Sequence, residues 1–196
     1  GGLFKQNEKW CYERNSEFCS VENGINLTRV YSFNDSHFAV MSPQLISALG
    51  KEFNYTEGNW GGCPFVLNTD RYRNGVKEIP CQNEFQSIRY DSIDQKPSII
   101  LVGGRFTLYL SSYLFDNKEG GKEKPELKWR TFRSINDLTF NKNFKETANK
   151  LISDGHQVVF VYPIDKWVLM MVKAGAEIIN LGDVKWLATE DKSKGK

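Results

Sequence analysis

The amino-acid sequence predicts an α/β fold in which helices cover a parallel sheet on both faces. Strand-like apolar runs alternate with helix-length segments along the chain. The clearest run, PSIILVGG, is continuously apolar and ends in two glycines, as parallel strands of α/β proteins often do. A length of 196 residues and a hydrophobic share of 40% suit one domain with its own core.

The first half of the chain predicts a strand, a helix, a long loop and a second helix. Residues 29–33 (RVYSF) are β-branched and aromatic and predict the strand. Residues 42–53 (SPQLISALGKEF) have apolar side chains at helical spacing, an early proline and a glycine near the end, which predict the first helix. Residues 54–81 are rich in glycine and proline and are expected to form a loop before a helix that begins near Gln82.

The second half predicts two buried strands, two helices and a short last strand. Residues 97–104 form the first buried strand, and residues 116–126 (DNKEGGKEKPE) are expected to be a solvated loop. A helix is expected from Ser134 as N-cap to Gly155 as the stop. The remaining strand, helix and strand are expected over residues 156–163, 165–175 and 176–182.

Charge and composition bound the partners and the domain limits. With 26 basic and 24 acidic residues the net charge is +2, so no nucleic-acid partner is expected. Residues 1–28 are a polar lead-in segment expected to pack on the main domain of 29–188, and residues 189–196 are a charged tail. No apolar run reaches the roughly 18 to 20 residues that span a bilayer, which predicts a soluble chain or the soluble domain of a larger protein.

The four cysteines fall as two local pairs, Cys11 with Cys19 and Cys63 with Cys81. None lies in a C-x-x-C motif, and loops of this length are readily closed by disulfides in an oxidising compartment. Free buried thiols and a metal site are the alternatives, of which the metal site is the least favoured. No cofactor is expected, because the sequence has neither a P-loop nor a G-x-G-x-x-G motif.

The stretch NDSH, residues 34–37, follows the first predicted strand and precedes a helix. A serine on such a turn would place its hydroxyl beside the free backbone amides of the helix start, which suit an anionic intermediate. The alternative is that Asp35 or Ser36 simply caps the helix. The G-x-S-x-G elbow of α/β-hydrolases is absent, since Asn34 and Phe38 stand at its glycine positions.

Longer segments make a family resemblance specific. VYSFNDSHFAVMSPQL resembles the first block of the SGNH (GDSL-type) hydrolases, with Asn34 in place of the usual glycine. GNWGGCPFV, CQNEFQSI, PSIILVGGRFTLYL, LFDNKEGG and LISDGHQVVFVYPI are similar, in the same order, to later segments of one branch of that family. In that branch the SGNH domain is attached to acyltransferase-3 membrane O-acetylases that modify bacterial surface polysaccharides. The resemblance runs from about residue 10 to residue 164.

This resemblance implies a three-layer α/β/α sandwich with a parallel, flavodoxin-like (SGNH) sheet. It implies Ser36 as the nucleophile, and as oxyanion donors the amide of Ser36 and one from Gly61 or Gly62. Arg105 would stand near the position where other SGNH enzymes place an asparagine, and would either bind substrate or pair with a local carboxylate. The resemblance also implies that His37, which belongs to the family's first sequence block, has a structural role on the side where substrate binds.

The departure from the family concerns its D-x-x-H motif near the C-terminus, which supplies the base. Asp183 matches the orienting aspartate, but Trp186 occupies the histidine position, and an indole cannot accept a proton. The other histidine, His156, is expected at the surface at the end of the sheet opposite the loops. Either the C-terminus is degenerate or rearranged, or the family's final segment is replaced or missing from this sequence, and we expect impaired catalysis of this chain.

The predicted function is an SGNH-type esterase or O-acetyltransferase domain acting on acetyl groups of bacterial envelope polysaccharide. The expected partners are an acetyl donor, a glycan acceptor and a possible N-terminal membrane acyltransferase domain. The expected location is the periplasm, as a soluble domain of an inner-membrane protein.

Two other readings stay open. One is a noncatalytic carbohydrate-binding or partner-docking module, in which loop aromatic residues would stack on sugar rings or serve as core. Those residues are Trp60, Phe106, Tyr109 and Trp186. The other is a flavodoxin-like cytosolic protein with reduced cysteines, although NDSH does not resemble a phosphate-binding loop.

Overall fold

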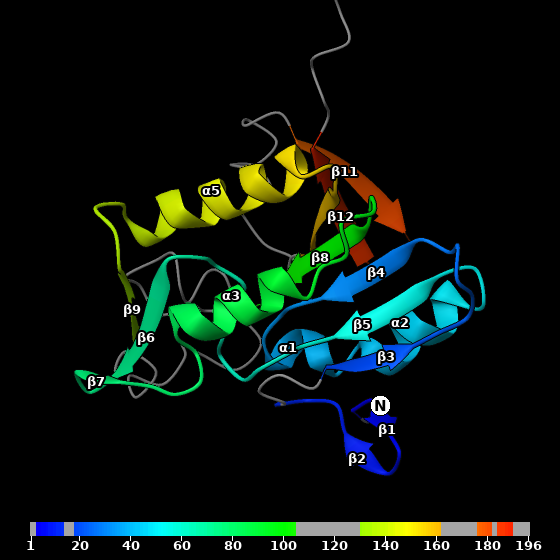
Figure 1. The fold of residues 1–196 in the computed structure, drawn as a ribbon, viewed down its shortest axis with the longest axis horizontal. Helices are drawn as coiled ribbons and strands as arrows, with labels where there is room; N and C mark the ends of the chain where they lie inside the picture. The colour runs from blue at the N-terminus through cyan, green and yellow to red at the C-terminus, as the bar shows by residue number, and fades with distance from the viewer. Residues whose placement is uncertain (1–2, 14–17, 105–129, 162–175, 182–183, 190–196) are drawn as a thin grey trace, which may run out of the picture.

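A computed structural model describes residues 3–13, 18–104, 130–161, 176–181 and 184–189 (Figure 1). The four helices within these ranges are α1 (Ser36–Ala39), α2 (Ser42–Leu49), α3 (Asn83–Asp91) and α5 (Phe140–Ser153). The strands in the same ranges are β1 (Lys5–Gln6), β2 (Lys9–Trp10), β3 (Cys19–Val21), β4 (Arg29–Ser32), β5 (Asn54–Glu57), β6 (Thr69–Arg73), β7 (Val76–Lys77), β8 (Ile99–Gly103), β9 (Arg130–Ser134), β10 (Gln157–Val161), β11 (Ala176–Leu181) and β12 (Val184–Thr189).

The main sheet confirms an α/β fold, but it is mixed rather than parallel. Within the described residues its order is β11-β12-β10-β8-β4-β5-β3. The four strands β10, β8, β4 and β5 are parallel, whereas β3, β12 and β11 pair antiparallel with their neighbours. The prediction of a parallel sheet is therefore wrong for the outer strands. Only residues 182–183 separate β11 from β12, and so short a connection cannot hold the crossover that parallel neighbours need.

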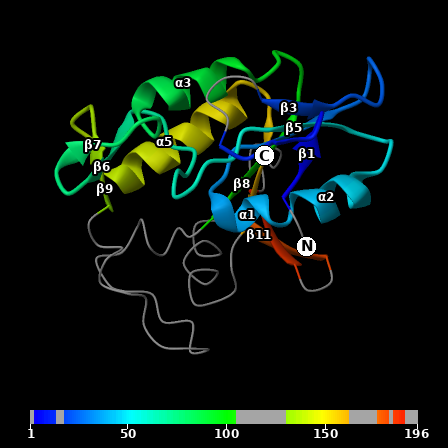
Figure 2. The same ribbon diagram turned by 90° about the horizontal axis from the view of Figure 1, so that it is seen from below.

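Helices lie on both sides of the sheet, with α1 and α2 on one side and α3 and α5 on the other (Figure 2). Side chains alternate along each strand, so each face has its own apolar core. The buried members under α1 and α2 are Val30, Phe38, Tyr55, Leu101 and Val161. The buried members on the α5 side are Tyr31, Phe33, Phe65, Val66, Ile100, Val102, Phe144, Leu151, Val158 and Phe160.

The strands predicted from apolar runs are confirmed as β4, β8, β10 and β11. The predicted helix after the first strand is α2, and Gln82 is the residue before α3, as expected. The helix expected over residues 165–175, the loop over 116–126 and residues 190–196 of the tail lie outside the described residues. No helix in the described part of the chain has both the length and the apolar character required to cross a bilayer.

Residues 54–81 are not the loop that the sequence predicts, because they contain β5, β6 and β7. The strand β5 lies between β4 and β3 in the main sheet, although its sequence is NYTE. All four of its residues are buried, and its polar side chains bind tertiary partners: Asn54, for example, accepts from the amide of Asn23 at 2.7 Å. A hydrophobic pattern cannot detect such a strand, since its burial depends on partners distant in sequence.

The expected N-cap at Ser134 is also wrong. Ser134 ends β9, which pairs antiparallel with β6 in a three-stranded sheet of order β7-β6-β9 within the described residues. The helix α5 begins after Thr139, whose hydroxyl accepts from the amide of Lys142 at 3.4 Å. The expected stop is confirmed: α5 ends at Ser153, and Gly155 has a φ of 92°, which favours glycine.

Both predicted disulfides are present, one between Cys11 and Cys19 and one between Cys63 and Cys81. All four cysteines are buried. The first bond attaches the residue after β2 to the start of β3, and the second attaches the loop after β5 to the segment just before α3. Because all the cysteines are oxidised, the alternatives of free thiols and a thiolate metal site are wrong.

Candidate active site

Ser36 is the first residue of α1, directly after the carboxyl end of β4. The helix cap is Asp35, whose Oδ1 accepts from the amide of His37 at 2.9 Å. Of the two capping residues that the sequence allows, Asp35 therefore has this role. The side chain of Ser36 is half-buried and is not used by the cap.

Asn34 and Asp35 attach this turn to the end of β8. Asn34 is completely buried, its Oδ1 accepts from the amide of Gly103, and its Nδ2 donates to Ser32 Oγ at 2.8 Å. The Asp35 carboxylate packs against Gly104, where an added Cβ would lie 2.7 Å from the carboxylate carbon. The asparagine that replaces the family's glycine thus joins the ends of two neighbouring strands.

Asn59 attaches the loop after β5 to the same turn. Its Oδ1 accepts from Ser32 Oγ at 3.0 Å and from the amide of Asn34 at 2.7 Å. The amide of Trp60 donates to the carbonyl of Asn34 at 2.9 Å. Asn59 carries no distinct signal in the sequence, because it is one asparagine in a polar loop, yet its hydrogen bonds join the loop that leads to Gly61 to the turn that holds Ser36.

Three buried side chains bind four successive carbonyl groups of the loop 61–64. Arg71 Nη1 donates to the carbonyl of Gly61 at 2.5 Å and to that of Gly62 at 2.7 Å. Arg89 Nη1 donates to the carbonyl of Cys63 at 3.1 Å, and Gln86 Nε2 to that of Pro64 at 3.0 Å. Each peptide unit is planar, so a fixed carbonyl directs the next amide to the opposite side. Arg71 thereby sets the direction of the Gly62 amide.

Burial of the Arg89 guanidinium at this loop is energetically unfavourable. It is completely buried, and its Nε and Nη2 have no partner among the described residues. Burial, together with the positive charge of Arg71, lowers the pKa of Arg89 to about 9. The Phe85 ring lies 4.3 Å from the guanidinium carbon and offers a cation–π contact.

Tyr12 and Glu13, from the lead-in segment, lie over Ser36. The Tyr12 hydroxyl forms hydrogen bonds with the side chains of Glu13 and Ser36. Burial and Glu13 raise the pKa of Tyr12, whereas the hydrogen bond with Ser36 lowers it. The amide of Glu13 donates to the carbonyl of Asn59 at 3.0 Å. Residues 1–28 were predicted only to pack on the main domain, since nothing in their sequence marks two of them as neighbours of Ser36.

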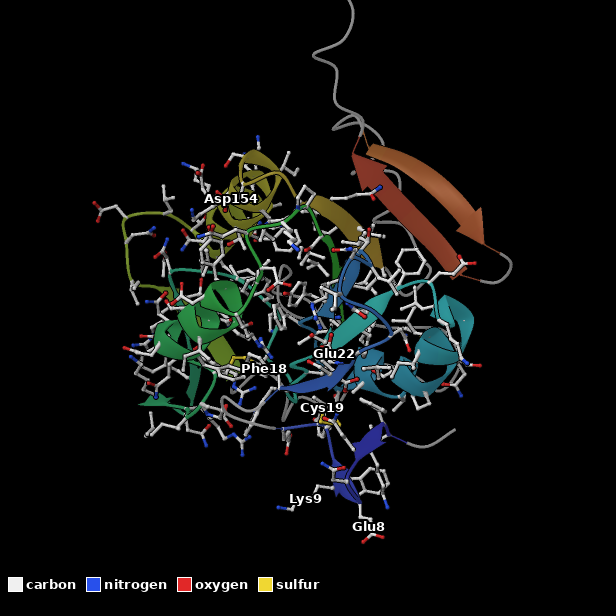
Figure 3. All side chains as sticks on the ribbon, turned by 45° about the vertical axis from the view of Figure 1, so that its right-hand side comes forward. Glu8, Lys9, Phe18, Cys19, Glu22 and Asp154 are labelled. Carbon is white, nitrogen blue, oxygen red and sulfur yellow. A yellow bond between two sulfur atoms is a disulfide. The ribbon has the colours of Figure 1, made fainter. Side chains whose placement is uncertain are left out.

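A hairpin formed by β1 and β2 precedes these residues and projects from the body with Glu8 and Lys9 at its tip (Figure 3). The amide of Cys11 donates to the carbonyl of Phe4 at 2.9 Å, and the disulfide to Cys19 then joins the hairpin to β3. Cys19 pairs with Glu57 across the sheet. The position of Tyr12 therefore depends on a covalent link to the sheet.

Glu57, at the end of β5, is a buried carboxyl group close to this turn. Its Oε2 accepts from Tyr55 Oη at 3.1 Å, and its Oε1 has no hydrogen-bond partner among the described residues. Burial raises the pKa of Glu57, and hydrogen bonds with Ser42, Tyr55 and Asn59 oppose that rise. The folded chain therefore binds this proton more tightly than the unfolded chain does.

We expect Glu57→Gln to stabilise the fold at pH 7 by on the order of 1 kcal/mol. A raised carboxyl pKa means that stability is lost as the pH rises from the unfolded-state value, roughly 4.3, through the folded-state value. Urea unfolding at pH 4 and pH 7 would measure this, and the gain should shrink at pH 4. Glu84→Gln, at a side chain that is 70% exposed, is the control. A destabilising effect of Glu57→Gln at pH 7 would contradict the expectation.

The structure brings several predicted site residues together at the carboxyl end of the sheet. Ser36 and Gly61 both lie next to the Tyr12 hydroxyl, and Gly62 follows Gly61 in the loop fixed by Arg71. The side chain of His37 is exposed on α1. Arg105, Asp183, Phe106 and Tyr109 lie outside the described residues.

Trp186 stands differently from its predicted place, whereas Trp60 lies in a loop, as predicted. Trp186 belongs to β12 and pairs with Val161, so its expected position in a loop is wrong; the antiparallel hairpin with β11 makes it part of the sheet. Trp60 is half-buried, and its ring packs against Phe85 at 5.7 Å between centroids. This contact makes Trp60 part of the packing around the second disulfide.

His156 is not the surface residue that the sequence predicts, since only 8% of it is exposed. It follows the turn at Gly155, and its amide donates to the carbonyl of Leu151 at 3.0 Å, which folds it back under α5. Burial lowers the pKa of His156. As expected, it lies at the amino end of β10, the opposite end of the sheet from Ser36. In the described part of the chain, no three His, Cys, Asp or Glu side chains are grouped to hold a metal ion.

The family comparison agrees with this arrangement. The family model described as "SGNH domain (fused to AT3 domains)" matches residues 6–191 of the 196. No curated protein and no solved structure matches the chain significantly. The family match covers the lead-in segment from Gln6 onward, the turn with Ser36, and β11 with β12. The chain therefore belongs to the SGNH domain family, of the kind fused to acyltransferase-3 (AT3) proteins.

Proposed function

We propose that Ser36 is the nucleophile of an SGNH-type esterase or O-acetyltransferase. Family membership supports an esterase or acetyltransferase type of role. The observation that carries the assignment to Ser36 is its half-buried hydroxyl at the start of α1, left unused by the cap, on a turn that the Trp60 amide joins to the residues just before the loop 61–64. A nucleophile of this kind needs both an accessible oxygen and nearby amide donors.

In the proposed reaction Ser36 Oγ attacks the carbonyl carbon of an acetyl ester. The new Oγ–C bond forms as the serine O–H bond breaks, and the carbonyl oxygen becomes an oxyanion. The amide of Ser36 and that of Gly61 or Gly62 are the donors for this oxyanion, and Arg71 holds the glycine carbonyls so that the Gly62 amide keeps its direction. Collapse expels the alcohol, whose oxygen takes up the proton that Ser36 lost. A sugar hydroxyl or water then takes the acetyl group, and its proton restores the Ser36 hydroxyl.

We further propose that turnover is impaired relative to family members that have the D-x-x-H histidine. Asp183 would have no imidazole to orient, because Trp186 stands three residues later and lies in β12. Loss of the base from such a site lowers the rate on the order of 10⁴-fold or more, leaving the oxyanion and binding contributions. Arg105 and His37 are proposed on the substrate side.

The proposed substrate is an acetyl group on bacterial envelope polysaccharide, and the proposed location is the periplasm. Two disulfides support an oxidising compartment. The fusion of related domains to AT3 domains supports a membrane acyltransferase domain as the partner that supplies acetyl groups. An acetyl donor and a glycan acceptor are the reactants that this scheme requires.

The test is hydrolysis of p-nitrophenyl acetate together with labelling of the serine by a fluorophosphonate probe. Ser36→Ala is expected to reduce hydrolysis to the buffer rate and to abolish labelling, because no other group would form the acyl-enzyme. Ser153→Ala, at an exposed position on α5, is the matched control and should behave as wild type. Labelling that survives in Ser36→Ala would refute the nucleophile, and a wild-type rate equal to that of histidine-containing family members would refute the impairment.

A further inference from the structure

The hydroxyl of Tyr12 lies between the proposed nucleophile and a carboxylate. It forms hydrogen bonds with both Ser36 and Glu13. A Cβ added at Gly61 would collide with Tyr12 Oη and lie 2.7 Å from Glu13 Oε1. Both oxygen atoms therefore lie against the loop 61–64, which holds the proposed oxyanion donors. Three oxygen-bearing side chains from two distant parts of the chain are thus gathered at one point.

The chemistry of these groups sets the direction of the hydrogen bonds. A carboxylate has no proton to donate, so Tyr12 Oη–H donates to Glu13. Tyrosine has one hydroxyl proton, and its oxygen is then left to accept from Ser36 Oγ–H. The resulting order is Ser36 to Tyr12 to Glu13, which is the direction in which a proton must leave an attacking serine.

The backbone around Tyr12 and Glu13 is held by contacts that a free tail would lack. Cys11 is bonded to Cys19, and the amide of Glu13 donates to the carbonyl of Asn59 at 3.0 Å. Glu13 has a φ of 61°, in the left-handed region that non-glycine residues rarely adopt. Backbone outliers of this kind persist where surrounding structure holds them, and they are frequent at functional sites.

We propose that Tyr12 and Glu13 accept the proton of Ser36 in place of the histidine that the family supplies from its C-terminal motif. This inference rests on the proposed function of Ser36. Tyr12 is a catalytic residue in this scheme because it touches the reacting oxygen, and Glu13 is a positioning residue that acts through Tyr12.

The proton balance of the step is as follows. As the Ser36 Oγ–C bond forms, the serine proton moves to Tyr12 Oη and the tyrosine proton moves to Glu13, which becomes a neutral carboxylic acid. Tyr12 carries no net charge before or after the transfer, in keeping with the raised pKa of its phenol. When the tetrahedral intermediate collapses, the same two groups return the proton to the oxygen of the leaving alcohol.

The same contacts would have the opposite consequence if Tyr12 only blocked the oxyanion loop. Removing its hydroxyl would then open the site and speed acylation, whereas loss of a proton acceptor slows it. Whether removal of the Tyr12 hydroxyl speeds or slows acylation therefore distinguishes the two roles.

The experiment measures hydrolysis of p-nitrophenyl acetate and the rate of fluorophosphonate labelling of Ser36 for the whole chain. Tyr12→Phe is expected to lower kcat and the labelling rate about 10- to 100-fold with KM unchanged, the lower part of the range for acid–base catalysis. Glu13→Gln should have a similar effect. The double variant should be no slower than Tyr12→Phe alone, because the two residues act as one unit.

Two matched controls use pairs elsewhere in the chain. Tyr90 also donates to a carboxylate, Asp154, far from Ser36, and Tyr90→Phe should leave both rates unchanged. Glu8 has a φ of 63° and belongs to the same segment as Glu13, and Glu8→Gln should also have no effect. Melting curves within a few degrees of wild type show that each variant is folded.

The outcomes distinguish this inference from the proposed function. If Ser36 is labelled and Tyr12→Phe is equally fast or faster, the relay is refuted and the nucleophile stands. If the slowing in the double variant is the product of the two single effects, Tyr12 and Glu13 do not act as a unit and the relay is refuted. If wild type is not labelled, or Ser36→Ala is labelled as well as wild type, the proposed function fails, and the relay fails with it.

Discussion

Replacing Arg71 by methionine is expected to lower the free energy of unfolding by about 3–5 kcal/mol, the typical result of removing one partner from a buried ion pair. Arg71 is only 3% exposed. It binds the carbonyls of Gly61 and Gly62, and its Nε lies 2.7 Å from Glu78 Oε2. Methionine fills similar space but leaves two buried carbonyls and a carboxylate without this donor. The loop 61–64 should then lose its geometry, and labelling of Ser36 should fall with it.

Urea unfolding and fluorophosphonate labelling would measure the two effects. Arg73→Met is a close control, because Arg73 pairs with the same Glu78 but is 46% exposed and does not touch the loop. Exposed ion pairs contribute about 0–1 kcal/mol, so this variant should remain near wild type in both measurements. Equal destabilisation by the two substitutions would show that the contacts of Arg71 with the glycine carbonyls add nothing measurable to the free energy of unfolding.

Gly104→Ala is expected to destabilise the fold by about 3–5 kcal/mol, the sum of backbone strain and overpacking. Gly104 has a φ of 133°, and an added Cβ would lie 2.7 Å from both Cγ and Oδ2 of Asp35. Asp35 is buried and caps α1, so it cannot move without moving Ser36. Under native conditions, the rate of Ser36 labelling should therefore decrease by more than the loss of stability alone can explain.

Gly75→Ala separates the two causes. Gly75 has a φ of 80°, but nothing lies within 4 Å of an added Cβ, so only the backbone strain of about 1 kcal/mol should be seen. Thermal unfolding and Ser36 labelling of both variants at one temperature provide the comparison. If Gly104→Ala is no worse than Gly75→Ala, then the contact between Gly104 and Asp35 does not hold the turn.

The sequence and the structure agree where local patterns carry the information. The apolar runs that became β4, β8 and β10 are long enough to specify strands. The cysteine spacings predicted the two local disulfides that are present, although the spacings alone left free thiols and a metal site open. Asp35 is a residue type that often caps helices. A helix cap directly after a predicted strand indicated that Ser36 lies at the end of that strand.

Long-range contacts decided the rest. The strand β5 has the sequence NYTE, and it is a strand because β4 and β3 pair with it on either side. The mixed order of the sheet depends on where β3 and β12 pair, and no local pattern records this. The same holds for Ser134, which belongs to β9 because β6 lies beside it.

By itself the sequence determined the α/β class, the strands with continuous apolar runs, and a serine on the turn after the first strand of the parallel set. Only the tertiary structure decided what surrounds that serine: Asn59 and Arg71 hold the backbone from Asn34 to the loop 61–64, and Tyr12 with Glu13 lies above the hydroxyl. The physical reason is that strand and cap signals arise between residues a few positions apart. A hydrogen bond between Tyr12 and Ser36 exists only after a disulfide and a sheet have brought two distant segments together.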